Sequence, residues 1–259
     1  MSDYLLAGQQ SELERLRVQA EVWEPAGRDL LARLGPGTGR RVVDIGCGAL
    51  GWLRLLSEWV GPSGQVIGTD IDDKLLDAAR ALELDNVRLL RDDLFASSLE
   101  PGSFDLVHAR FVIAPVGRVT EQLAVYRKLA APGALLVLED PDTGSWHFNP
   151  PAPAADRLVE LTRQAFAAVG SDLDAGRSTP AVLAANGLEP STHAAVLALP
   201  PGHPYLRVPI QFTVSLEPRF AGIIDPDELR ALRATAEAEL AEPGRWGTTF
   251  TLIQTWARC

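Results

Sequence analysis

The stretch Val42-Val43-Asp44-Ile45-Gly46-Cys47-Gly48-Ala49-Leu50-Gly51 decides the fold of this chain. It reads as a buried strand followed by a glycine-rich turn that opens a helix. A second strand pattern ends at Gly68-Thr69-Asp70-Ile71-Asp72, with a carboxylate at its end. This order of elements is typical of a nucleotide-type site in a doubly wound sheet. The spacing of the glycines also satisfies the dinucleotide motif G-x-G-x-x-G.

Asp44 argues against a bound dinucleotide. Its carboxylate precedes the first glycine by two residues, so it lies at the carboxyl end of the first strand, where a pyrophosphate would sit. In a partly desolvated crevice, the repulsion between these like charges would cost several kcal/mol. The same carboxylate suits a ligand that carries an ammonium group.

These residues resemble the class I S-adenosylmethionine-dependent methyltransferases of the bacterial small-molecule type, and the resemblance runs from about Arg40 to Cys259. It implies S-adenosyl-L-methionine as cofactor, with S-adenosyl-L-homocysteine as product. That cofactor has a charged amino-acid end, a sulfonium and two ribose hydroxyls, and no phosphate. Family members usually carry D-x-G-x-G-x-G, whereas two residues separate Gly48 from Gly51 here, so the role of Gly51 stays open.

Strand and helix patterns alternate from Arg40 onward, which predicts an α/β fold with a parallel sheet. We expect strands near 41–45, 65–70, 87–91, 104–110 and 134–139, and helices near 51–60, 73–82, 120–129, 154–169 and 179–185. Two further strands are expected at 193–199 and 248–257. The resemblance implies a doubly wound, Rossmann-like sheet of seven strands in the order 3-2-1-4-5-7-6, with the last strand antiparallel.

We expect a single domain over residues 1–259 with two additions. Residues 1–38 form an N-terminal helical cover of two helices, interrupted at Pro25. Residues 200–246 form a lid inserted between the last two strands, with an acidic helix near 226–241. Residues 141–153 are rich in Pro, Gly and Asn and are expected to form a loop.

The resemblance assigns most of the cofactor-binding residues. It places Asp44, Gly46 and Gly48 around the amino-acid end of the cofactor. Asp70 would accept hydrogen bonds from both ribose hydroxyls, and Ile71 would cover the adenine. Asp92 would accept from the adenine amino group, with Asp93 as the one-residue alternative or as a helix N-cap.

The fourth strand motif, Phe104–Arg110, brings Ala109 and Arg110 near the site by the same resemblance. Arg110 either orients a ligand or pairs with a local carboxylate. His108 is expected to pack within the strand. The N-terminal segment is similar to a leading helix that folds over the cofactor, which would let Tyr4 and Gln19 contact it; simple helix packing remains the alternative for Gln19.

Trp146, His147 and Phe148 are the candidate substrate-binding residues. An aromatic cluster on a loop is expected to pack against another segment, and residues 205–220 are the candidate partner. His147 would act as the catalytic general base if the methyl acceptor is a hydroxyl.

Composition narrows the partners of this 259-residue chain. A net charge of −10 disfavours a nucleic-acid partner, and no apolar run is long enough to span a membrane. The two cysteines and four histidines form no metal-ligand pattern, so no metal is predicted. The N-terminus lacks a signal-peptide pattern, which predicts a cytoplasmic protein. The oligomeric state stays open.

The predicted reaction is methyl transfer to an O, N or C nucleophile of a small, hydrophobic metabolite, of the kind found in secondary metabolism. Positioning and exclusion of water can supply most of the acceleration, so no obligatory catalytic residue is required. Three alternatives remain: a cyclase-like or decarboxylating enzyme that uses the cofactor without methyl transfer, a NAD-dependent oxidoreductase, and a binding module without catalysis.

Overall fold

The computed structural model describes residues 10–49 and 51–259. Its centre is a seven-stranded sheet in the order β3-β2-β1-β4-β5-β10-β7, in which β10 runs antiparallel to both neighbours. The strands are β1 (Arg41–Ile45), β2 (Gln65–Asp70), β3 (Val87–Arg91), β4 (Phe104–Arg110), β5 (Ala130–Asp142), β7 (Ser191–Ala195) and β10 (Thr251–Arg258). Counted along the chain, this is the predicted order 3-2-1-4-5-7-6, and the predicted fold class is confirmed.

Apolar layers cover both faces of the sheet, as a parallel sheet requires. On one face, Val42 and Leu106 pack with α2 (Leu53–Val60) and α3 (Asp73–Arg80). On the other face, Val43 and Val107 pack with the remaining helices. These are α4 (Ile113–Val116), α5 (Val119–Leu129), α6 (Pro153–Ala167), α7 (Ala175–Ala185), α8 (Val208–Ser215) and α9 (Pro226–Leu240).

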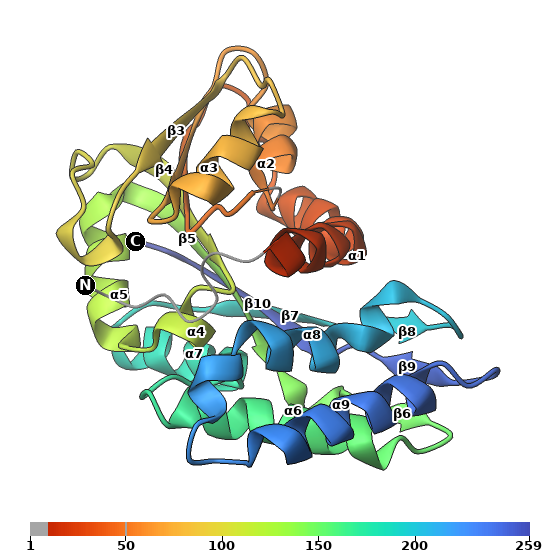
Figure 1. Ribbon diagram of the computed structural model, residues 1–259. Coiled ribbons are helices and arrows are strands. Elements are labelled where there is room, and N and C mark those ends of the chain that lie inside the picture. The colour runs from red at the N-terminus through yellow and green to blue at the C-terminus, as the bar shows by residue number, and fades with distance from the viewer. Residues whose placement is uncertain (1–9, 50) are drawn as a thin grey trace.

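The N-terminal segment forms one helix, α1 (Gln10–Leu34), and the expected interruption at Pro25 is wrong. A proline inside a helix removes one backbone hydrogen bond but does not prevent the helix from continuing when packing holds both parts. Trp23 and Leu30, on either side of Pro25, are both fully buried. In Figure 1, α1 (red) lies between α2 and the layer of α6, α8 and α9, and it contacts both α2 and α8.

Two of the expected strands are each divided between two sheets. The 193–199 segment splits into β7 and β8 (Ala198–Leu199), and the 248–257 segment into β9 (Trp246–Thr248) and β10. A small sheet joins β8 and β9 to β6 (Phe148–Asn149) in the order β6-β9-β8. It therefore ties together the two ends of the 200–246 insertion.

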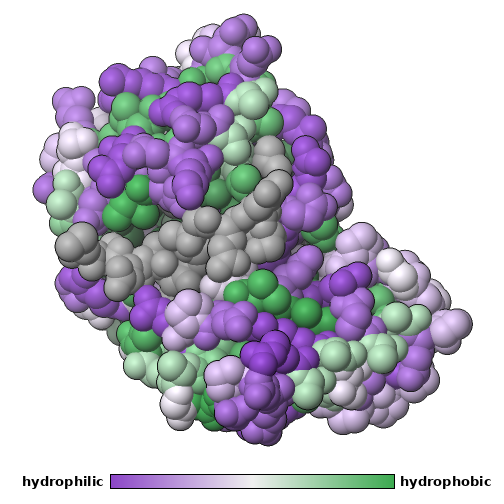
Figure 2. Space-filling model, viewed as in Figure 1, coloured by the Kyte–Doolittle hydropathy of each residue, from purple (hydrophilic) through white to green (hydrophobic). Residues whose placement is uncertain are grey.

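The expected loop at 141–153 begins later than predicted, because β5 continues to Asp142 in register with Thr251 of β10. Within the insertion, the 3-10 turns η3 (Pro204–Arg207) and η4 (Glu217–Phe220) flank α8. Helices α8 and α9 pack on α6. In the space-filling view, hydrophobic residues gather over α8, on the side that faces α1 (Figure 2). Within the described part of the chain, no helix is long and apolar enough to cross a membrane.

The side chain of Asp140 links the end of β5 to α4 through a hydrogen bond. Its side chain is 1% exposed, and Oδ1 accepts a hydrogen bond of 2.9 Å from the backbone N–H of Ala114. Oδ2 is buried and has no hydrogen-bond partner among the described residues. Burial raises the pKa of Asp140 well above the usual aspartate value, despite the backbone N–H groups that lower it.

We expect the Asp140→Asn variant to lose part of the pH dependence of stability. The folded carboxyl binds its proton more tightly than the unfolded one, so the free energy of unfolding falls as pH rises from the ordinary aspartate pKa through the raised one. Asparagine keeps Oδ1 and cannot ionise. Denaturant titrations of both proteins at several pH values measure the difference, and equal pH slopes would contradict the assignment.

Candidate active site

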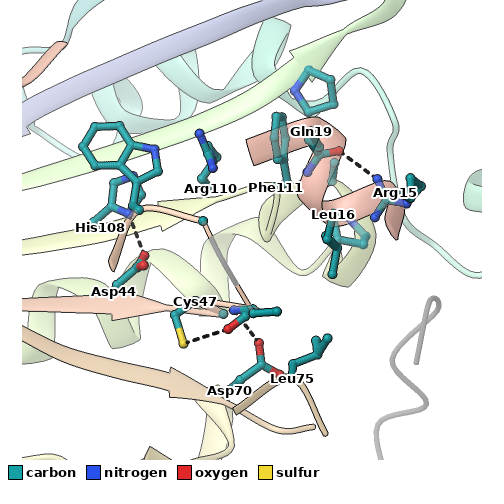
Figure 3. Close-up of a pocket in the computed structure, with 18 of the residues that line it drawn as sticks. Arg15, Leu16, Gln19, Asp44, Cys47, Asp70, Leu75, His108, Arg110 and Phe111 are labelled. Atoms are coloured by element: carbon teal, nitrogen blue, oxygen red, sulfur yellow. Dashed lines mark hydrogen bonds and ion pairs between the residues drawn. The ribbon is translucent and has the colours of Figure 1, made fainter. Parts of the chain in front are cut away.

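A cavity opens at the carboxyl ends of β1 and β4. Its volume is about 890 Å³ when its opening to solvent is included. One part of the wall is polar and comprises Arg15, Gln19, Asp44, Asp70, His108 and Arg110. Much of the rest is apolar and comprises Leu16, Trp52, Leu75, Phe111, Phe166, Leu173, Phe212 and Phe250, among others. Figure 3 shows the polar side chains converging from α1, β1, β2 and β4.

The glycine turn bounds this cavity and needs its glycines for two different reasons. Gly46 and Gly48 have φ values of 65° and 60°, in the left-handed region that favours glycine. A Cβ on Gly46 would also lie 2.7 Å from Cγ2 of Val112. Gly51 has no such φ, but a Cβ there would lie 3.2 Å from the Cys47 carbonyl and 3.5 Å from Nη2 of Arg110. The missing side chain of Gly51 therefore leaves room for the guanidinium of Arg110 beside the turn.

Asp44 is 2% exposed, and its two carboxylate oxygens have different environments. Oδ1 lies 2.7 Å from Nδ1 of His108. Oδ2 is buried and has no hydrogen-bond partner among the residues described. A buried carboxylate oxygen without a partner is costly, so Oδ2 is an acceptor for a ligand with N–H donors.

Arg110 presents the opposite charge to the same cavity. Its Nη1 is buried and, within residues 10–49 and 51–259, has no hydrogen-bond partner. Asp44 and Arg110 thus line one cavity, and each has one buried polar atom, an acceptor and a donor respectively, without a partner among the described residues. This pair matches the ammonium and carboxylate of an amino-acid end and does not match a pyrophosphate, which would meet the Asp44 carboxylate.

Asp70 lies where this cavity meets a second one, because it lines both. Its carboxylate accepts hydrogen bonds from the backbone N–H groups of Gly48 at 3.0 Å and Asp72 at 2.9 Å. Burial raises the pKa of Asp70, and these N–H groups oppose that rise. The carboxylate thus holds the glycine turn against the end of β2.

The second cavity has a volume of about 1200 Å³ including open solvent and brings together Asp70, Ile71, Asp92 and Asp93. Asp93 caps the 3-10 turn η1 (Leu94–Ala96) by accepting from the backbone N–H of Phe95, so the N-cap alternative describes its contact. Asp92 Oδ1 accepts from the backbone and hydroxyl of Ser98. Asp92 and Asp93 both line the second cavity, which is where the adenine is expected.

Helix α1 reaches the first cavity, as expected. Gln19 lines it and accepts a hydrogen bond of 2.7 Å from Nη1 of Arg15, shown as a dashed line in Figure 3. Arg15 also stacks over the ring of Phe212, with 4.8 Å between Cζ and the ring centroid. Tyr4 lies outside the described residues.

The structure places four of the predicted site residues outside both cavities. Ala109 is buried in the core on the opposite face of β4. Trp146 is buried against Phe212 and Phe250, with ring centroids 6.4 and 5.6 Å away. Phe148 is buried near Gly247. His147 is exposed and lines neither cavity, because successive residues of an extended chain point to opposite sides and both its neighbours point inward.

His108 is fully buried in β4, as expected. It also lines the cavity and lies between two carboxylates, Asp44 and Glu139, which the sequence did not predict. Val107 and Ala109 face the core, so His108 shares the other face of β4 with Arg110. The alternation could have revealed this, but the pairing of His108 with Asp44 across β1 and β4 required the sheet order. Phe166 and Phe250 come from distant segments and carried no sequence signal, whereas Phe212 lies in the 205–220 segment expected to pack against the aromatic loop.

Comparisons with known proteins agree with this geometry. Residues 42–133 match a family model described as a methyltransferase domain. Demethylmenaquinone methyltransferase of Lactococcus lactis is 40% identical over 81 residues, which are 30% of this chain and 32% of that protein. The chain spans about a third to a half of the length of the first curated relatives it matches.

Solved structures show the same fold over most of the chain. An S-adenosylmethionine-dependent methyltransferase from Mesorhizobium loti aligns with a TM-score of 0.52 and 19% identity, over 93% of this chain and all of that one (100%). Geranyl diphosphate C-methyltransferase from Streptomyces coelicolor aligns with a TM-score of 0.54 and 17% identity, over 100% of this chain and 89% of that one. The chain therefore shares the Rossmann-like fold of these solved S-adenosylmethionine-dependent methyltransferases, and residues 42–133 match the methyltransferase domain model.

Proposed function

We propose that this protein transfers a methyl group from S-adenosylmethionine to a small apolar metabolite. The observation that carries the proposal is the pair Asp44 and Arg110 on the wall of the first cavity, where Asp44 Oδ2 and Arg110 Nη1 each lack a hydrogen-bond partner among the described residues. The cofactor's amino-acid end brings one cation and one anion to that pair. A NAD-dependent oxidoreductase would instead place a pyrophosphate beside the Asp44 carboxylate.

The ribose and adenine of the cofactor would extend from the first cavity into the second. Asp70, which lines both, accepts the ribose hydroxyls. Ile71 covers one face of the adenine in the second cavity, and Asp92 or Asp93 accepts from its amino group. Gln19 of α1 closes the amino-acid end of the site.

The apolar part of the first cavity is the site for the methyl acceptor. Phe166 of α6, Phe212 of α8 and Phe250 form three of its surfaces, and Phe212 belongs to the 200–246 insertion that we propose as the lid. Apolar walls favour an apolar acceptor because they remove its surface from water. The relatives named for demethylmenaquinone and geranyl diphosphate support a small-molecule acceptor.

When bound, the cofactor supplies a methyl group already activated by its sulfonium. The protein therefore has to orient the acceptor in line with that methyl and keep water out. Water would be excluded by Phe166, Phe212 and Phe250. Asp44 and Arg110 would hold the amino-acid end of the cofactor in place. His147 points to solvent, so this mechanism does not use it as a general base.

Calorimetric titration tests the proposal directly. The protein is expected to bind S-adenosylmethionine and S-adenosylhomocysteine and to show no heat with NAD. Mass spectrometry of reactions with a set of apolar hydroxyl, amine and enol acceptors should then detect S-adenosylhomocysteine together with a methylated product, in which a methyl group has replaced a hydrogen of the acceptor. Binding of NAD without either sulfur ligand would overturn the proposal, whereas tight cofactor binding with a changed but unmethylated substrate would favour the cyclase-like or decarboxylating alternative.

A further inference from the structure

A buried ion cluster lies beneath the polar part of the first cavity. His108 is fully buried; its Nδ1 lies 2.7 Å from Asp44 Oδ1, and its Nε2 lies 3.1 Å from Glu139 Oε1. Ionised carboxylates only accept hydrogen bonds, so a histidine between two of them satisfies both when both its nitrogens carry protons. The geometry therefore favours an imidazolium at this position.

The cluster continues across the sheet to α1. Glu139 Oε2 accepts a hydrogen bond of 2.6 Å from Nε2 of Gln254, which also donates to the carbonyl of Ala26 at 3.1 Å. The strand register makes this possible, because Asp44 is opposite His108 across β1 and β4, and Glu139 is opposite Gln254 across β5 and β10. One chain of hydrogen bonds thus links Asp44 to the helix that also brings Gln19 to the cavity.

The surrounding charges balance around the imidazolium. Asp44 of β1 and Glu139 of β5 contribute one negative charge each, and Arg110 on β4 interacts with both and contributes a positive one. Asp140 of β5 interacts with His108 at longer range, and its raised pKa favours the neutral acid. The indole of Trp52 covers the imidazole, with ring centroids 4.2 Å apart. With a neutral imidazole, two buried carboxylates would be left with Arg110 as their only compensating cation in this cluster.

We propose that His108 is a positioning residue for the cofactor: its imidazolium engages Oδ1 of Asp44 and so leaves Oδ2 to face the ligand's ammonium. This inference rests on the proposed function. It assigns the Asp44–His108–Glu139–Gln254 chain the task of presenting a single charged oxygen to the cavity. Oδ2 has no hydrogen-bond partner among the described residues, whereas Oδ1 is engaged by His108.

The proposed role of His108 predicts the direction in which ligand affinity changes with pH. Burial lowers the pKa of His108, but Asp44 and Glu139 outweigh burial and raise it above the usual histidine value. The imidazolium therefore persists to higher pH than that of an ordinary histidine and is lost as pH rises through the raised pKa. Affinity for a ligand with an amino-acid end is expected to fall over the same range.

The first experiment compares two ligands on wild type and His108→Gln. S-adenosylhomocysteine has the amino-acid end, whereas 5′-methylthioadenosine has the adenosine part alone. His108→Gln is expected to weaken S-adenosylhomocysteine binding at neutral pH by about tenfold or more and to leave 5′-methylthioadenosine binding near the wild-type value. The ratio of wild-type to variant affinity for S-adenosylhomocysteine, which cancels the titration of the ligand's own amine, should fall towards one at alkaline pH.

Two further variants separate positioning from folding. Glu139→Gln removes one of the two carboxylates, so it should shift the pH midpoint of S-adenosylhomocysteine affinity to lower pH, which a purely structural role would not do. His193→Gln on β7 is the matched control and should behave like wild type, since His193 lines neither cavity.

Three results would overturn the inference. If His108→Gln weakens both ligands equally, His108 has only a structural role. If it weakens neither, Asp44 needs no positioning by His108. If wild type binds neither ligand, the proposed function fails, and this inference fails with it.

Discussion

Asp70→Ala is expected to weaken S-adenosylhomocysteine binding by about 3 kcal/mol, roughly a hundredfold in Kd, because hydrogen bonds to an ionised group contribute about 1.5–3 kcal/mol each. The carboxylate lies at the junction of both cavities and offers two oxygens to the ribose. Both S-adenosylhomocysteine and 5′-methylthioadenosine carry this ribose. Titration calorimetry should therefore show the loss for both ligands.

Part of the Asp70→Ala effect could pass through the glycine turn, because Asp70 also accepts from the backbone N–H of Gly48. Asp70→Asn separates the two contributions: it keeps an oxygen for the turn and removes the charge, so it should give an intermediate loss. Asp72→Ala is the matched control. Asp72 caps α3 through the N–H of Lys74, so its loss should reduce stability by about 1 kcal/mol and leave ligand affinity unchanged. An Asp70→Ala protein that binds both ligands like wild type would remove Asp70 from the site.

Asp44→Asn is expected to weaken S-adenosylhomocysteine binding by about 1.5–3 kcal/mol, roughly 10- to 100-fold in Kd, through loss of one charge-assisted hydrogen bond. The amide keeps the shape of the side chain and an oxygen for His108 but presents an N–H₂ group or a neutral oxygen to the ligand's ammonium. Affinity for 5′-methylthioadenosine, which has no ammonium, should stay near the wild-type value. The same titrations measure both ligands.

The control for Asp44→Asn is the same substitution at Asp105. Asp105 lies near the opposite end of β4, where its carboxylate accepts from the backbone N–H of Arg41 at 2.8 Å, and it lines neither cavity. Asp105→Asn should bind both ligands normally. If Asp44→Asn loses both ligands to the same extent, Asp44 acts on the fold of the glycine turn and not on the amino-acid end.

The sheet could be predicted closely because parallel strands with both faces covered leave a strong local signal. The bounds of β1, β2, β3 and β4 are those expected; β1 is a short apolar run closed by Gly46, and β2 and β3 end at Asp70 and before Asp92. The predicted bounds were wrong where packing between distant segments determines the length of an element. Helix α1 continues through Pro25, and β5 extends to Asp142 along β10.

The residues proposed for the cofactor could be named because they lie at strand ends or in the glycine turn. The carboxyl ends of parallel strands meet at one edge, so Asp44, Asp70 and Asp92 come together once the strand order is known. No such rule predicts which residues line the apolar part of the first cavity, where we propose that the methyl acceptor binds. Trp146 and Phe148 lie in the core, while Phe212 and Phe250 face the cavity, and nothing in their local sequence distinguishes the two outcomes.

The amino-acid sequence by itself determined the α/β fold class and an anionic group at the head of the glycine turn, because these depend on hydrophobic period and on glycine's conformational freedom; the strand order followed from the family resemblance. Tertiary structure alone decided which oxygen of Asp44 has no partner among the described residues, since His108, Glu139 and Gln254 come from three other strands. Local pattern specifies the path of the backbone. Long-range register specifies which polar groups satisfy one another, and a ligand site is made of those left unsatisfied.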